Sequence, residues 1–121
     1  MQENVKVSKF YLDILNQIFE IEKKAGQIQE SNSIARNINR LREIFDNELP
    51  NPLGTGIGLI YVNPLGEDYN ETRTDCEANI AGVSTENLKI TEVIKPIIYY
   101  RDGGRKGIVQ KGVVVVEEAK L

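Results

Sequence analysis

The sequence predicts an α+β fold in which two helices precede a small all-β module of short strands. In residues 1–49 apolar side chains recur every three or four positions, the spacing of one face of a helix. After residue 58 they form short runs separated by turn residues, which is typical of strands. We therefore expect a helical hairpin for dimerisation over 1–49, a glycine- and proline-containing hinge over 50–57 and a partner-binding β domain over 58–121.

The first predicted helix follows Ser8, whose hydroxyl suits an N-cap, and it stops at Gly26. Lys23 and Lys24 suit the negative end of the helix dipole. Two apolar stripes run side by side along this helix, which gives it an unusually wide apolar face. The first stripe consists of Phe10, Ile14, Ile18, Ile21 and Ala25, and the second of Tyr11, Leu15 and Phe19.

The second predicted helix follows Ser33 and ends before Pro50 and Pro52. A short polar link over residues 26–32 separates the two helices, so we expect an antiparallel helical hairpin. The apolar stripe of the second helix consists of Ile34, Ile38, Leu41, Phe45 and Leu49.

Two helices alone would leave these apolar faces in water, so something must cover them. We favour a second copy of the chain, which would give a homodimer with a four-helix bundle. The alternative is that the helices pack on the β module of their own chain. The expected dimer interface consists of Phe10, Ile14, Ile18, Ile21, Ile38, Leu41 and Phe45.

The β module is expected to open with an apolar strand over residues 59–62, followed by a type I turn at 63–66. A polar-rich stretch up to Ile80 has no clean period, and we interpret it as an irregular loop. Residues 88–100 form a long β-type run that Pro96 interrupts, which indicates an edge strand, a bulge or two short strands. A hairpin turn at 101–104 and a valine-rich strand complete the module.

Composition argues against several classes of function. Fifteen basic and eighteen acidic residues give a net charge of −3 with no basic stripe, so nucleic acid is not an expected partner. No apolar run is long enough to span a membrane, and no signal-peptide layout is present, so we expect a cytoplasmic protein. The sequence contains no histidine, which removes Ser-His-Asp and Cys-His catalysis and histidine-ligated metals.

The remaining reactive residues predict no enzyme, no cofactor and no metal site. Cys76 lies between acidic residues, which raise the pKa of a thiol, so we interpret it as a packing residue. The glycines near residue 54 lack the lysine and the following helix of a phosphate-binding loop. The acidic loop 67–77 lacks calcium-loop spacing, although it keeps a small enzyme open as a rival interpretation.

The order of these elements and several short motifs resemble the GrpE family, the nucleotide exchange factors of DnaK-type chaperones. After the helices, that family has an apolar strand, Gly-Glu-Phe-Asp-Pro, His-Glu-Ala, a strand, a turn with Gly-Arg and a final valine-rich strand. This sequence has corresponding residues in the same order, over roughly residues 8–118. They are Gly66-Glu67-Asp68-Tyr69-Asn70-Glu71, Glu77-Ala78, Val93-Ile94, Gly104-Arg105 and Val113-Val114-Val115-Val116.

The sequence also departs from the family pattern. Only seven residues precede Ser8, so we expect the long N-terminal paired helix of the family to be missing. Thr74-Asp75-Cys76-Glu77-Ala78 stands where the family has His-Glu-Ala. The Gln-Lys-Gly-Tyr of the family becomes Lys95-Pro96-Ile97-Ile98. The resemblance is therefore to a shortened and divergent member.

The resemblance implies a co-chaperone that binds the nucleotide-binding domain of a DnaK-type chaperone and promotes ADP release by favouring its open form. It places Tyr69, Ile94, Arg105 and Val116 at the partner contacts. Each also has a structural interpretation: Tyr69, Ile94 and Val116 as core residues, and Arg105 as a hairpin charge. The alternative function is a dimeric adaptor that binds another protein and has no exchange activity.

Overall fold

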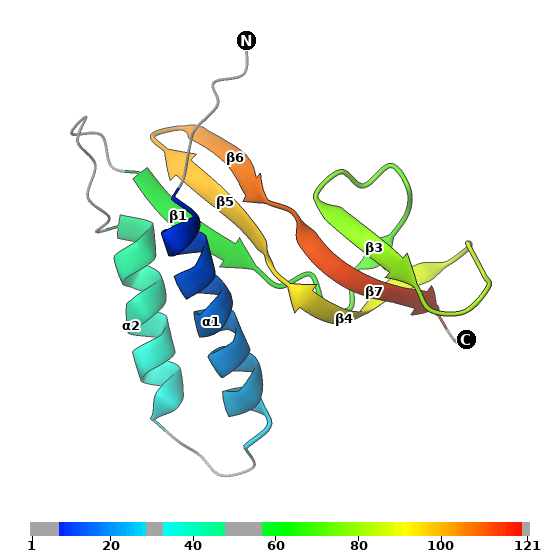
Figure 1. The fold of residues 1–121 in the computed structure, drawn as a ribbon, viewed down its shortest axis with the longest axis horizontal. Helices are drawn as coiled ribbons and strands as arrows, with labels where there is room; N and C mark the ends of the chain where they lie inside the picture. The colour runs from blue at the N-terminus through cyan, green and yellow to red at the C-terminus, as the bar shows by residue number, and fades with distance from the viewer. Residues whose placement is uncertain (1–7, 29–32, 48–56, 120–121) are drawn as a thin grey trace.

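Two helices are followed by a β-rich region in the computed structural model, which describes residues 8–28, 33–47 and 57–119 (Figure 1). The predicted α+β class is therefore confirmed. The helices are α1 (Lys9–Gly26) and α2 (Ile34–Asn47), and the strands are β1 (Ile57–Val62), β2 (Asp68–Tyr69), β3 (Cys76–Ile80), β4 (Leu88–Lys95), β5 (Ile97–Asp102), β6 (Arg105–Gln110) and β7 (Gly112–Glu118).

The helices begin and end where local signals place them. The Ser8 hydroxyl accepts a hydrogen bond from the Phe10 N–H at 3.2 Å, and α1 ends at Gly26 with Lys23 and Lys24 in its last turn. Residues 29–32, which join the helices, lie outside the described residues, as do residues 50–56 of the expected hinge. The helical hairpin and the four-helix bundle therefore stay predictions.

The strands form two sheets. The three-stranded sheet has the order β1-β5-β6 and is antiparallel throughout. The four-stranded sheet has the order β2-β4-β7-β3, in which β3 runs parallel to β7 and the other pairs are antiparallel. The chain must therefore pass from one edge of the four-stranded sheet to the other between Tyr69 and Cys76.

One long hairpin connects the two sheets. Strands β4 and β5 form its first arm, and β6 and β7 form its second (Figure 1). Pro96 interrupts the first arm and Lys111 the second. The half of the hairpin next to its turn, β5 and β6, therefore belongs to the three-stranded sheet, and the other half, β4 and β7, belongs to the four-stranded sheet. Of the alternatives that the sequence left open for Pro96, the structure has two short strands. Neither is an edge strand, since each has a neighbour on both sides.

A pair of side-chain amides fixes this break to α1. Asn16 Nδ2 donates to Gln110 Oε1 at 3.0 Å, and Gln110 Nε2 donates to Asn16 Oδ1 at 2.9 Å. Gln110 Nε2 also donates to the Pro96 carbonyl at 3.0 Å. Further along α1, Lys23 Nζ donates to the Val93 carbonyl at 3.0 Å. Both arms of the hairpin are thereby connected to one helix.

The wide apolar face of α1 is largely covered within the chain. Leu15, Ile18 and Phe19 are buried in one core cluster that continues through both sheets. At the end of α2, the carboxylate of Asp46 pairs with Arg101, and its backbone lies so close to Gly58 that a Cβ there would clash. Packing of the helices on the strands of their own chain, the alternative to the dimer, therefore covers most of the apolar surface that we assigned to a dimer interface. From the second helix, Ile38 and Phe45 join the same cluster, and its strand members include Leu59, Tyr61, Ile98, Val114 and Val116.

Two strands lie in the stretch that we expected to be irregular. Cys76–Ile80 forms β3, and Asp68–Tyr69 forms β2. The preceding turn also differs from the expectation, because the Glu67 N–H donates to the Pro64 carbonyl at 3.1 Å. Gly66 stands third in this turn with φ +85°, which is the arrangement of a type II turn and requires glycine or asparagine.

We predict that the amide pair contributes measurably to stability. Asn16→Ala and Gln110→Ala should each lower the free energy of unfolding by about 1–2 kcal/mol, because each removes both hydrogen bonds between these two partly buried amides. The double variant should show a coupling energy of about 0.5 kcal/mol or more in urea denaturation. Lys111→Ala is the matched control, since its side chain is exposed. Additive effects of the two alanines would contradict the prediction.

Candidate protein-binding surface

The four residues that the resemblance assigns to partner contacts do not form one surface. Tyr69 is half-buried on β2, opposite Leu88, and Ile94 is 44% exposed on β4. Arg105 is exposed at the start of β6, beside the turn of the three-stranded sheet. Val116 is completely buried at the centre of the four-stranded sheet, because it faces inward on β7. Its alternative interpretation as a core residue fits this position, and only Ile94 and Arg105 offer exposed side chains.

The expected dimer interface divides in the same way. Ile18, Ile38 and Phe45 are buried in the core of a single chain, and Ile14 is half-buried against it. Their apolar surface is therefore already covered without a second copy. The other three members remain accessible: Phe10 is 66% exposed, Ile21 48% and Leu41 39%.

The acidic loop is organised by one cation, Arg73. Its Nε donates to Asp75 Oδ1 at 2.6 Å and its Nη2 to Glu67 Oε1 at 2.8 Å, while Nη1 donates to the Asp68 carbonyl at 3.0 Å. The hydrogen bonds from Arg73 lower the pKa of Asp75, and those to Asp75 raise the pKa of Arg73 itself. These two carboxylates are therefore occupied, and Asp75 is a poor general acid. An arginine inside an acidic segment was the sequence signal for this arrangement.

Cys76 is a buried thiol at the start of β3. Burial raises its pKa to about 11, and the negative charge of Asp75 acts in the same direction. The thiolate fraction near neutral pH is consequently very small, so the residue is a weak nucleophile. Its side chain lies close to Gly112, where any Cβ would press on it and on Ile97.

A cleft of about 330 Å³ lies between α2 and β1, and sequence reasoning did not find it. Its charged groups already have partners within the chain: Arg42 with Glu22 at 3.6 Å, Glu43 with Arg40 at 3.5 Å, and Asp46 with Arg101. The cleft thus offers little unpaired charge to a ligand. It is lined by Leu15, Asn39, Arg42, Glu43, Asp46, Leu59, Ile60 and Tyr61.

Tyr61 carries the one buried side-chain polar atom without a hydrogen-bond partner among the described residues, its hydroxyl. Its ring packs edge-to-face on Phe19, with centroids 5.7 Å apart, and the Arg42 guanidinium lies 4.7 Å above it. Burial raises the pKa of Tyr61 to about 12, and the nearby negative charge of Glu22 adds to this. The ring contributes to stability through these two contacts.

Charge is separated between two parts of the fold, which the even distribution along the sequence does not reveal. We call residues 63–95 and 111–119, which build the four-stranded sheet, the acidic half; it contains nine acidic and four basic residues. The other described residues are the helices, β1 and residues 96–110, which we call the helical half. They contain nine basic and six acidic residues. Residues 96–110 lie between the two segments of the acidic half in the sequence, but in the structure they belong to the helical half.

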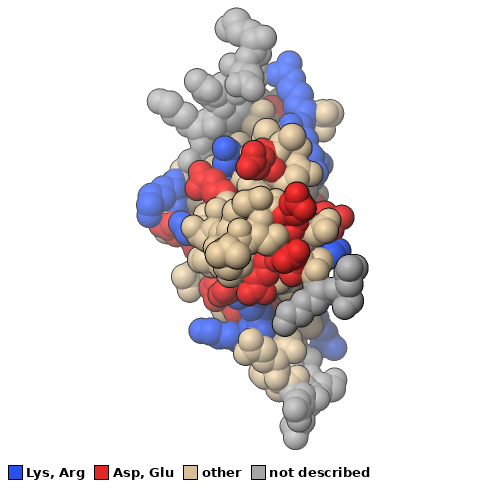
Figure 2. Space-filling view, turned by 90° about the vertical axis from the view of Figure 1, so that its right-hand side faces the viewer, with Lys and Arg blue, Asp and Glu red and all other residues tan. Residues whose placement is uncertain are grey.

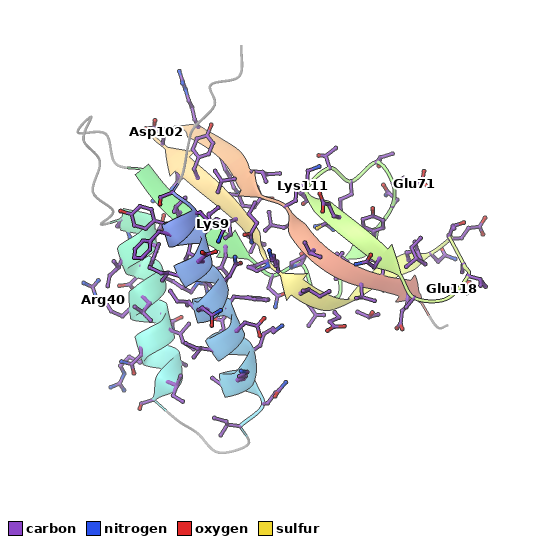
Figure 3. All side chains as sticks on the ribbon, in the orientation of Figure 1. Lys9, Arg40, Glu71, Asp102, Lys111 and Glu118 are labelled. Carbon is purple, nitrogen blue, oxygen red and sulfur yellow. The ribbon has the colours of Figure 1, made fainter. Side chains whose placement is uncertain are left out.

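Figure 2 views the far end of the acidic half, where acidic side chains surround an uncharged area. Glu71 and Glu118 both lie toward this end, whereas Asp102 lies at the distant turn of the three-stranded sheet (Figure 3). No ion pair joins Glu71, Glu86 or Glu118 to a base within the part of the chain that the structure describes. The apolar side chains exposed in the acidic half include Ile80, at 45%, and Val83, which is fully exposed. An exposed apolar area with a charged rim is one of the features that mark protein-binding surfaces.

Neither a membrane-spanning helix nor a cluster of three or more metal-ligating side chains is found among the described residues. Comparison of the chain with protein-family models, with curated proteins and with solved structures finds no match.

We predict that Tyr61 makes stability fall at alkaline pH. The group is neutral when folded up to a pKa of about 12, whereas an unfolded tyrosine ionises near its model value of 10.0. Below pH 10 the hydroxyl is neutral in both states, and between pH 10 and 12 the free energy of unfolding falls because the unfolded state ionises first. Tyr61→Phe keeps the ring contacts and removes the unpartnered hydroxyl. Denaturation at pH 8 and pH 11 should show a smaller alkaline loss for this variant than for wild type, with Tyr11→Phe as the control. An unchanged alkaline loss would contradict the prediction.

Proposed function

We propose that this chain is a non-catalytic adaptor that binds a basic protein partner through its acidic half. The observation that carries the proposal is the separation of charge: nine acidic against four basic residues on the four-stranded sheet, with Ile80, Val83 and Ile94 exposed among them. Complementary charge steers association and rejects acidic partners, while apolar anchors contribute most of the affinity.

The chemistry of the acidic loop supports binding rather than catalysis. Three of its carboxylates are paired with cations: Arg73 binds Asp75 and Glu67, and Lys89 binds Asp68 at 2.9 Å. Cys76 is buried with a raised pKa. A small enzyme would need an accessible group whose pKa lies near the working pH. Neither the paired carboxylates of the acidic loop nor the buried Cys76 is such a group.

A nucleotide exchange factor of the GrpE type is the second candidate, favoured by the order of elements. Two helices precede the β module, a turn at residues 64–67 follows its first strand, and a hairpin turn with Gly103 at φ +60° precedes the last two strands. The same order carries the resemblance. In this form the β module would bind the open state of a DnaK-type ATPase domain in the cytoplasm and speed ADP release.

A homodimer is part of both forms of the proposal. Phe10 and Ile21 lie eleven residues apart on α1, which is about three helical turns, so they share one face. Leu41 on α2 is also exposed. These three side chains supply the apolar contact that remains for a bundle with a second copy, since the rest of the predicted interface is in the core.

Leu41→Asp and Ile21→Asp should convert a dimer to a monomer, because each places a charge in an apolar contact. Both side chains are exposed in the single chain, so the fold should remain intact by circular dichroism. Sedimentation at micromolar concentration measures the change, and Asn37→Asp on the exposed side of α2 is the control. A wild-type chain that sediments as a monomer would remove the dimer from the proposal.

The partner is tested by affinity capture followed by binding with the purified partner. Glu71→Gln, Glu86→Gln and Glu118→Gln combined should weaken a direct complex about tenfold, equivalent to roughly 1.4 kcal/mol, and reduce its salt dependence. Asp13→Gln on α1 is a control that lies outside the acidic half. If the partner is a DnaK-type chaperone, release of labelled ADP with and without the protein decides between the two candidates. A partner that the combined variant binds as well as wild type does would overturn the assignment of the surface.

A further inference from the structure

We propose that the outer edge of β3 binds an extended, basic peptide segment as a fifth strand of the four-stranded sheet. The inference rests on the proposed function, because it names the kind of segment that the adaptor would take. β-Augmentation of this type uses main-chain hydrogen bonds for affinity and side-chain contacts for specificity.

The register of β3 defines which backbone groups its outer edge presents. Cys76 lies opposite Gly112, Ala78 opposite Val114 and Ile80 opposite Val116. The Gly112 N–H donates to the Asp75 carbonyl at 2.9 Å, and the Ala81 N–H donates to the Val116 carbonyl at 2.9 Å. These two hydrogen bonds fix the pattern of the parallel ladder: the N–H and C=O groups of the odd-numbered residues of β3 point toward β7.

The N–H and C=O groups of Ala78 and Ile80 therefore point away from β7. Within the described ranges no turn, loop or neighbouring strand supplies them with a backbone partner. Both residues lie on a strand without proline or a register shift, and its one charged side chain is Glu77, which opposes an acidic strand and favours a basic one. The edge is thus available to an added strand.

The other sheet edges are less suitable. The helix α2 lies against β1, where the backbone of Asp46 leaves no room for a Cβ at Gly58. The strand β2 has only two residues. The strand β6 begins with Arg105 and Lys106, and its ladder with β5 contains a register shift. Of the four edges, β3 is the one with five residues and no such protection.

Charge determines which occupant fits. Glu77 projects from β3 to the exposed face, and Glu71 lies in the preceding loop. Pairing β3 with β3 of a second copy would bring two acidic halves together, which like-charge repulsion opposes. A strand with lysine or arginine at alternate positions would instead place a cation beside Glu77 and its other side chains beside Ala78 and Ile80.

The probe is a ten-residue synthetic peptide that alternates lysine with threonine or valine. We expect it to bind the full chain in calorimetry and to increase the hydrogen-exchange protection of the Ala78 and Ile80 amides, which the β7 ladder leaves unprotected. The same peptide with alternate amides N-methylated should bind at least tenfold more weakly, and one with glutamate in place of lysine should not bind. Equal binding of the N-methylated peptide would overturn the proposal, because charge alone would then explain it.

Two variants separate the edge from its charge. Ala78→Pro removes an outward N–H and should weaken the lysine peptide at least tenfold, whereas Ala78→Ser keeps the N–H and should not. Glu77→Lys changes no backbone group and should reverse the preference toward the glutamate peptide, so the proposal remains testable if the proline variant fails to fold. Protection of Ala78 and Ile80 that rises with protein concentration, without peptide, would assign the edge to a second copy and overturn it. Because the peptide assay needs no natural partner, the proposed function can fail while this inference stands.

Discussion

The paired amides of Asn16 and Gln110 hold the place where one hairpin passes from the first sheet into the second. Without a fixed break, the arms of this hairpin would twist as one continuous ribbon. Gln110 connects the Pro96 carbonyl to the helix, so α1, the three-stranded sheet and the break in the hairpin share one polar contact. Together with the Lys23–Val93 hydrogen bond and the core that continues through both sheets, this contact joins the acidic half to the helical half.

Most of the fold could be predicted because its signals are local. Ser8, Gly26 and the helical periodicity define α1 within a residue, and Pro96 divides the long β-type run. The strand β3 was missed because its alternation is weak: Cys76 is buried and Ala78 half-buried, whereas Ile80, its one strongly apolar residue, is exposed. Its partner β7 is also more than thirty residues away and parallel, and no turn signal announces such a pair.

The candidate surface was harder to predict than the fold. The sequence indicated that the β module carries recognition, and this stays a prediction; of the four residues assigned to it, Ile94 and Arg105 have exposed side chains. Val116 could not be assigned from the sequence, because the alternation of a valine run does not tell which face is buried. The charge separation arises because residues 96–110 lie with the helices in the structure. Counting charges over consecutive stretches of the sequence groups these residues with the acidic strands and therefore does not reveal it.

The central strand of the acidic half is also the last one to be made. Both of its neighbours, β4 and β3, precede β7 in the sequence, so they have no common partner until β7 is synthesised. A ribosome that has released the chain only as far as residue 111 therefore exposes two strands that cannot yet pair with each other through β7. The four-stranded sheet therefore cannot be completed before residues 112–118 have left the ribosome, whereas the helices and β1 are available for packing earlier.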